Sequence, residues 1–214
     1  TDQGFDEFFG FLGASHVYLP SDQDAKMLRG RKAEEEHEHE YLTDALAREA
    51  EAFVHANRER PFVLTVSFNA PHSPFEASEK YLERCGELTG PKRTYAAMIL
   101  ALDDAIGGIL AGLEKEGLAE KTLVFFASDN GAPLEEGPGS NGELQRGKAF
   151  LFEGGNRVPL ILRWPAHAAA GTKVTAPVSL LDIPATTLKL AGATGETLAE
   201  LDGRDLAPLL AGEM

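Results

Sequence analysis

The 214-residue sequence is short of cysteine, of basic residues and of long apolar runs, and each shortage excludes something. Its single cysteine, Cys85, cannot form a disulfide within the chain. No apolar run approaches the 18 or so residues that a membrane-spanning helix needs, so we expect no membrane span. Lys and Arg number 20 against 34 Asp and Glu, and the resulting net charge of -14 argues against a nucleic-acid partner.

The first residues also lack familiar features. Thr1-Asp2-Gln3-Gly4 contains no initiator Met and no basic-then-apolar signal, so we expect the natural start of the protein to lie upstream. What remains is ordinary: 43% of the residues are hydrophobic and 25% are charged, as in globular proteins. This length is enough for one large domain or two small ones.

One short stretch is the most informative part of the sequence. Residues 122–127 are apolar, β-branched and aromatic, which predicts a strand buried on both faces, and Ser128-Asp129-Asn130-Gly131 follows directly. Ligands bind at the carboxyl edge of parallel sheets, and carboxylate and amide oxygens suit calcium or magnesium. Asp129 and Asn130 are therefore candidate metal ligands. A turn in which both merely bond the local backbone explains the same residues.

The hydrophobic pattern predicts an α/β protein with a mostly parallel sheet flanked by helices. Apolar residues recur every three to four positions in two segments, which predicts helices, and two further apolar runs predict buried strands. A strand, helix and strand in succession predict a right-handed crossover between parallel neighbours. We expect residues 1–40 to form an irregular lead-in and residues 41–214 the α/β core. The predicted helices span 41–57 and 91–116, and the further strands 62–68 and 158–164.

A histidine follows the first of these strands. His72 lies between Pro71 and Pro74, which stiffen the loop. If the strands at 62–68 and 122–127 are parallel neighbours, His72 and Asp129 lie on the same edge of the sheet. An ordinary surface histidine is the alternative.

A lysine lies in the long glycine-rich connection 131–156. Lys148 on such a loop would supply the local positive charge that an anion site needs in a protein of net charge -14. An exposed lysine without a role is equally compatible with the pattern.

Other polar residues are assigned structural roles. Asp103 and Asp104 point about 100° apart on the predicted helix, so we interpret them as structural or solvated. His37 and His39 belong to an acidic run that is more typical of a solvated surface than of a metal site. Asp182 is a predicted N-cap of a helix that reaches Leu190, and Asp205 of a last short helix.

Taken together, several motifs resemble those of the sulfatase family, arylsulfatase-like proteins of the alkaline-phosphatase-like fold. The likeness runs along nearly the whole chain. The motifs are GFDEFFGFLG, NAPHSPF, YAAMILALDDAIG, SDNG, RGKAFLFEGGNRVPLILRWP, LDIPATTLKLAGA and LDGRDLAPLL.

The resemblance implies a site. It implies that Asp129 and Asn130 are ligands of a calcium ion, or of magnesium, that clamps the sulfate group. It also implies that His72 and Lys148 contact the sulfate ester, with Lys148 helping the leaving oxygen and His72 a second candidate for that role. The expected substrate is a sulfated small molecule or glycan. Members are often exported, so the resemblance suggests a periplasmic or secreted protein.

The sequence also departs from the family pattern. Ala132 and Ala149 replace residues usual there, which affects only loop shape. More importantly, the C-x-P-x-R motif that yields the formylglycine nucleophile is absent, as is an acidic pair of metal ligands, and Cys85 lacks that context. We expect a carboxyl-side portion of a catalytic domain, inactive without its N-terminal half. The alternatives are a phosphate or phosphonate ester hydrolase of the same fold and a non-catalytic fragment.

Overall fold

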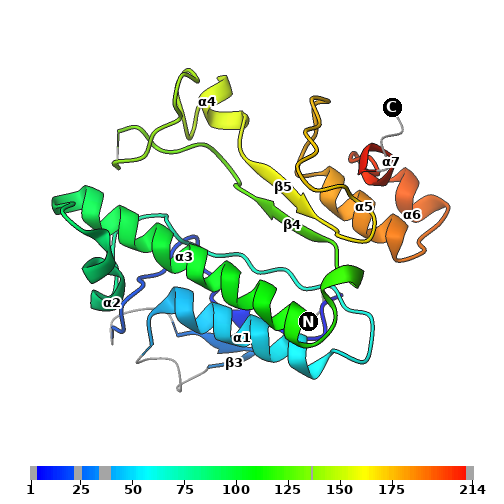
Figure 1. The fold of residues 1–214 in the computed structure, drawn as a ribbon, viewed down its shortest axis with the longest axis horizontal. Coiled ribbons are helices and arrows are strands. Elements are labelled where there is room, and N and C mark those ends of the chain that lie inside the picture. The colour runs from blue at the N-terminus through cyan, green and yellow to red at the C-terminus, as the bar shows by residue number, and fades with distance from the viewer. Residues whose placement is uncertain (1–3, 22–25, 34–39, 136, 211–214) are drawn as a thin grey trace. The chain divides into compact units, whose positions relative to one another are not determined.

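The computed structural model describes residues 4–21, 26–33, 40–135 and 137–210. The chain divides into two compact units, the first made of residues 1–117 with 135–139 and the second of residues 118–134 with 140–214 (Figure 1). The acidic run with His37 and His39 lies outside the described residues.

The first unit is built on two long helices that confirm the predicted ones. Helix α1 (Leu42–Ala56) packs against α3 (Gly90–Lys115). The buried α3 residues Ala97, Ala101 and Ala105 are small and recur every fourth position, which lets the partner helix approach closely. By length and composition alone α3 is apolar enough to cross a membrane, but here it packs against α1 and α2 (Glu79–Leu82).

Short strands occupy the lead-in that was expected to be irregular throughout. β1 (Phe9–Gly10), β2 (Leu28–Arg29) and β3 (Lys32–Ala33) form an antiparallel sheet in that order. A 3-10 turn, η1 (Glu83–Cys85), follows α2. The thiol of Cys85 is buried and lies 3.3 Å from the carbonyl oxygen of Tyr81, so it is an inert part of the core.

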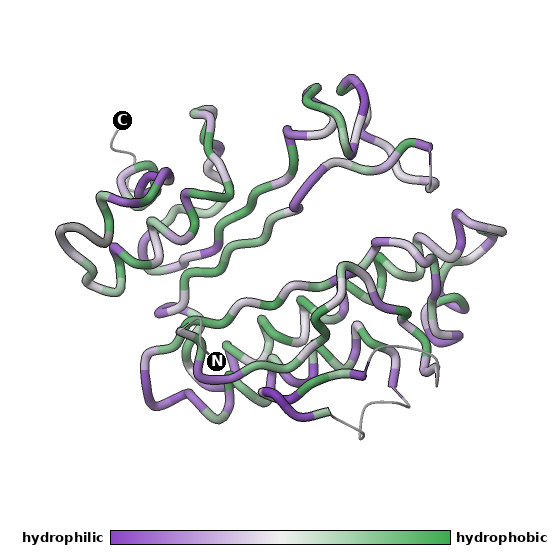
Figure 2. Tube along the Cα trace, turned by 180° about the vertical axis from the view of Figure 1, so that it is seen from behind, coloured by the Kyte–Doolittle hydropathy of each residue, from purple (hydrophilic) through white to green (hydrophobic). Residues whose placement is uncertain are grey.

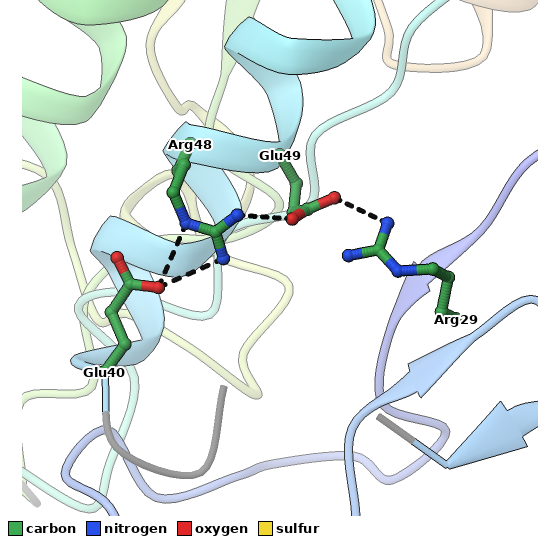
Figure 3. A network of polar contacts seen from close by, with 4 residues as sticks. All are labelled: Arg29, Glu40, Arg48 and Glu49. Carbon is green, nitrogen blue, oxygen red and sulfur yellow. Dashed lines mark hydrogen bonds and ion pairs between the residues drawn. The ribbon is translucent and has the colours of Figure 1, made fainter. Parts of the chain in front are cut away.

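A network of charged residues ties β2 to α1 (Figure 3). Glu49 accepts a hydrogen bond from Arg29 at 2.7 Å with one carboxylate oxygen and one from Arg48 at 2.6 Å with the other. Arg48 also bonds Glu40 at 3.1 Å. The two arginines hold the pKa of Glu49 below its usual range, with Arg29 the stronger influence.

The predicted strand at 62–68 is not a strand in the structure. Its residues still alternate between exposed and half-buried, with Val63, Thr65 and Ser67 exposed, as they would in a strand with one buried face. A strand is defined by hydrogen bonds to a neighbour, and this segment pairs with no other described segment. The prediction of a buried strand is therefore wrong here, because an apolar run does not specify the neighbour with which a strand would pair.

The second unit contains the other two predicted strands, but they are antiparallel. β4 (Val124–Ala127) pairs with β5 (Leu160–Arg163), with Val124 opposite Arg163 and Ala127 opposite Leu160. A parallel pair needs a long crossover, usually a helix. Here the described part of the connection folds back as a loop that carries the single-turn helix α4 (Glu153–Asn156). The prediction of a mostly parallel sheet is therefore wrong for the described strands.

The β4–β5 pair is also less buried than predicted. Figure 2 shows largely hydrophobic colouring along the pair and a hydrophilic stretch after β4. Phe126 is 37% exposed and Ile161 58% exposed, so neither strand is buried on both faces. A two-stranded ribbon cannot cover both of its own faces.

The carboxyl-terminal helices are held by one buried carboxylate. α5 (Asp182–Leu190) begins at Asp182 rather than after it, so the predicted N-cap is displaced by one residue. The two carboxylate oxygens of Asp182 accept the backbone N–H groups of Ser179 and Arg204, each at 2.7 Å. Asp205 accepts the N–H of Ala207, the first residue of the last helix, at 2.9 Å, but it lies one residue before the N-cap position, which is Leu206. The remaining elements are η2 (Ala119–Lys121), α6 (Glu196–Ala199) and α7 (Ala207–Leu210).

Candidate functional site

The polar triplet after β4 forms a tight local turn. Asp129 accepts the N–H of Asn130 at 2.9 Å with Oδ1, and the Ser128 hydroxyl donates to the Asn130 carbonyl at 2.8 Å. These bonds are those of the local-turn alternative. They engage only one carboxylate oxygen of Asp129, whose side chain is exposed, so the same conformation is compatible with metal binding.

Glycines allow the backbone of the Lys148 loop to pack directly against the backbone of the residues after this turn. The Gly131 N–H donates to the Gly155 carbonyl at 3.0 Å, and the Lys148 N–H donates to the Ala132 carbonyl at 3.3 Å. A Cβ at Gly131 would overlap the carbonyl of Gly154, and one at Gly147 the carbonyl of Ala132. Glycine is required here because two backbone segments touch. The glycine-rich loop thus returns to the residues after Asp129 and Asn130, and the backbone of Lys148 bonds to Ala132.

Asn141 joins these two segments, a role that its sequence context does not predict. Its Oδ1 accepts the Ala132 N–H at 2.8 Å, and its Nδ2 donates to the carbonyls of Ala132 at 3.0 Å and Arg146 at 2.9 Å. One side-chain amide therefore satisfies three backbone groups. Its place among glycines was the only signal, since Asn-Gly is equally typical of an ordinary turn.

The backbone on both sides of Lys148 adopts an uncommon conformation. Arg146 has φ 64° and Ala149 has φ 72°, in the left-handed region that residues with a Cβ avoid. Such conformations persist only where the surroundings enforce them, and they concentrate at functional sites. The positive φ angles of Arg146 and Ala149 therefore indicate that contacts with the surrounding residues fix the conformation of the Lys148 loop.

His72 belongs to the first unit. The backbone N–H of His72 donates to the Asn69 carbonyl at 2.7 Å, and the ring Nδ1 lies 2.7 Å from the carbonyl oxygen of Ser73. Because a carbonyl only accepts, Nδ1 carries a proton, and this contact orients the exposed ring. Asp129, Asn130 and Lys148 belong to the second unit, where the Lys148 backbone bonds to Ala132, two residues after Asn130; that their side chains form one site stays a prediction. That His72 joins them at one edge stays a prediction.

Asp129 and Asn130 offer the type of ligand that a hard cation prefers, but fewer ligands than it needs. Asp129 offers a carboxylate and Asn130 an amide carbonyl, which are ligands typical of calcium and magnesium. Calcium takes about six to eight oxygens, so this chain supplies part of such a shell. Among the residues that the structure describes, no group of three or more His, Cys, Asp or Glu could hold a metal.

The aspartates on α3 have the structural role expected of them. Asp104 forms an exposed ion pair with Arg84, one of whose bonds measures 3.0 Å. The guanidinium lowers the pKa of the Asp104 carboxyl. This pairing confirms that Asp104 belongs to the surface of the helix.

The fold and the loop define an α/β protein with a metal-compatible turn and a lysine on a glycine-rich loop. The profile of the Sulfatase family matches residues 1–193, and the chain belongs to the sulfatase family. It is 42% identical to steryl-sulfatase of Mus musculus over 80% of this chain and 28% of that protein. It is 36% identical to N-acetylgalactosamine-6-sulfatase of Mus musculus over 99% of this chain and 43% of that protein.

Solved structures show the same fold. The crystal structure of Ps i-CgsB in complex with k-i-k-neocarrahexaose matches with a TM-score of 0.91 and 34% identity, over 99% of this chain and 51% of that chain. The fold is therefore the α/β, alkaline-phosphatase-like fold of the sulfatases. In each of these comparisons the chain spans about half or less of the relative's length.

Proposed function

We propose that this chain is the carboxyl-side portion of a sulfatase catalytic domain that hydrolyses sulfate esters. The observation that supports this most is the backbone link between the Lys148 loop and the residues after Asp129 and Asn130. Within a sulfatase-family chain, that link supports a site in which the Lys148 ammonium and the oxygens of Asp129 and Asn130 act on one bound sulfate group.

The chemistry assigns each residue a task. As the S–O bond breaks, negative charge builds on the leaving oxygen and stays on the sulfuryl oxygens. The Lys148 ammonium stabilises the leaving oxygen by charge and by donating a hydrogen bond. His72 contacts the ester through Nε2, because Nδ1–H is held by the Ser73 carbonyl. A calcium ion held in part by Asp129 and Asn130 would, when bound, neutralise charge on the sulfuryl oxygens.

The remaining parts of the site come from elsewhere in the protein. In this proposal the formylglycine nucleophile and the other metal ligands lie in an N-terminal portion, so the 214-residue chain alone does not turn over. The substrate class is a sulfated small molecule or glycan. Relatives are named for both kinds, a steryl ester and a carbohydrate, so their names do not choose between them.

The test is a substrate comparison in the full-length protein. Purified protein with calcium is assayed on an aryl sulfate and on the matching aryl phosphate, together with Lys148→Ala, Lys148→Arg and the control Lys173→Ala at an exposed lysine. We expect sulfate hydrolysis that falls about 100-fold or more in Lys148→Ala, less in Lys148→Arg, and not at all in the control.

Three outcomes would overturn the proposal. Faster hydrolysis of the phosphate would favour a phosphoester hydrolase of the same fold. Equal activity of Lys148→Ala and Lys173→Ala would remove Lys148 from the site. Turnover by the 214-residue chain alone would refute a nucleophile located upstream.

A further inference from the structure

Tyr18 has no task in the chemistry above, yet it holds the loop that carries His72. Tyr18 is 1% exposed. Its hydroxyl lies 2.6 Å from the carbonyl oxygen of Asn69 and 2.9 Å from that of His72. Both oxygens are acceptors, so the single phenolic proton is shared between them. The two carbonyls belong to the first and last residues of one turn, which the His72 N–H closes by donating to Asn69 at 2.7 Å.

The tyrosine is itself fixed from several sides. Its N–H donates to Oε2 of Glu76 at 2.8 Å, and its carbonyl accepts the N–H of Leu42 at 2.9 Å. Its ring stacks on Tyr41 at a centroid distance of 5.9 Å. The backbone of Tyr18 is therefore anchored both to α1 and to Glu76, four residues after the turn that its hydroxyl contacts. A donor held this firmly imposes its position on the 69–72 turn.

The backbone that Tyr18 contacts also orients the imidazole. The His72 ring donates from Nδ1 to the Ser73 carbonyl, so its direction depends on the backbone of residues 72 and 73. Burial raises the pKa of the Tyr18 phenol, so the hydroxyl stays a donor at neutral pH.

We propose that Tyr18 is a positioning residue: it sets the His72 imidazole for contact with the sulfate ester. This rests on the proposed role of His72. The residue acts through the backbone, so its loss should affect turnover more than substrate binding.

The experiment compares Tyr18→Phe with Tyr41→Phe in the full-length protein. Tyr41 is also buried, and its hydroxyl also donates to a backbone carbonyl, that of Glu76 at 3.0 Å, outside the 69–72 turn. Each variant is assayed on an aryl sulfate, and the ring nitrogens of His72 are observed by 15N NMR, assigned with His72→Gln. Thermal unfolding of both variants measures the structural cost.

We expect Tyr18→Phe to lower kcat about ten-fold with KM within about two-fold, and to reduce the fraction of neutral His72 protonated on Nδ1. Tyr41→Phe should leave both quantities near their wild-type values. Replacement of Tyr18 by 4-aminophenylalanine keeps a donor in place and should restore kcat and the spectrum. It also provides the test if Tyr18→Phe does not fold.

An unchanged His72 spectrum in Tyr18→Phe, or equal changes in both phenylalanine variants, would overturn the proposal. A 4-aminophenylalanine variant that folds but does not restore the spectrum would overturn it too. The NMR measurement needs no substrate. A wild-type protein inactive on sulfate esters would therefore refute the proposed function, while the spectra would still decide whether Tyr18 positions His72.

Discussion

Among the carboxylates that the structure describes in the second unit, Asp182 should be the one whose replacement by alanine destabilises that unit most. Asp182 is 8% exposed and accepts two backbone N–H groups from separate segments, each at 2.7 Å. A hydrogen bond to a charged group contributes about 1.5–3 kcal/mol, and Ser179 and Arg204 are partly open to water, so the lower end applies to each. The expected loss in Asp182→Ala is about 3 kcal/mol.

The network around Asp182 supports this magnitude. The Thr186 hydroxyl donates to the Asp182 carbonyl at 2.7 Å and accepts the N–H of Leu206 at 2.9 Å, so two residues of α5 hold residues 204–206. A Cβ on Gly203 would overlap the Leu181 carbonyl, which shows how closely the segments approach. Losing the carboxylate therefore loosens a contact between distant parts of the sequence.

Chemical denaturation at neutral pH measures this loss, with Asp205→Ala as the control. Asp205 accepts one N–H two residues away, so its replacement should cost about 1 kcal/mol. Asp182→Asn keeps one acceptor oxygen and turns an NH2 group toward an N–H, so it should fall between the two. A smaller loss in Asp182→Ala than in Asp205→Ala would refute the reasoning.

Two further predictions concern the ion network and the glycines of the Lys148 loop. Because Arg29 and Arg48 lower the pKa of Glu49, the folded state gains stability from this carboxylate above its unfolded pKa and loses it as pH falls through the folded value. Glu49→Gln should therefore be less stable than wild type at pH 7, by about 1 kcal/mol or less for pairs with exposed arginines, and the gap in thermal melts should close in acid. Gly154→Ala places a Cβ against the Arg146 carbonyl and should cost about 1–3 kcal/mol with a fall in sulfate hydrolysis. Gly107→Ala, in open space on α3, should instead stabilise the protein, and equal unfolding curves for the two glycine variants would contradict this account.

The long helices were predictable because their signal is local. The apolar spacing of 41–57 and 91–116 gave α1 and α3 to within about one residue at each end. Apolar runs at 122–127 and 158–164 predicted two strands, but they did not predict the antiparallel direction, because an apolar run does not specify the strand with which it pairs. For the same reason residues 62–68 show strand periodicity and no strand pairing.

The candidate site divides in the same way. Asp129, Asn130, His72 and Lys148 came from their positions after apolar runs and in a glycine-rich loop. Asn141 did not, because its three hydrogen bonds to residues before and after it exist only once the loop has folded. Tyr18 likewise lay in an aromatic segment with no period to interpret.

The sequence alone determined the two long helices, the family that the motifs resemble and the candidate site residues, because residue type and spacing decide these properties locally. The tertiary structure alone decided that β4 and β5 run antiparallel, that glycines press the Lys148 loop onto Ala132, and that Tyr18 holds the His72 turn. Each of these depends on backbone groups far apart in the chain meeting at hydrogen-bond distance. Such meetings are set by packing of the whole unit, which no short stretch of sequence specifies.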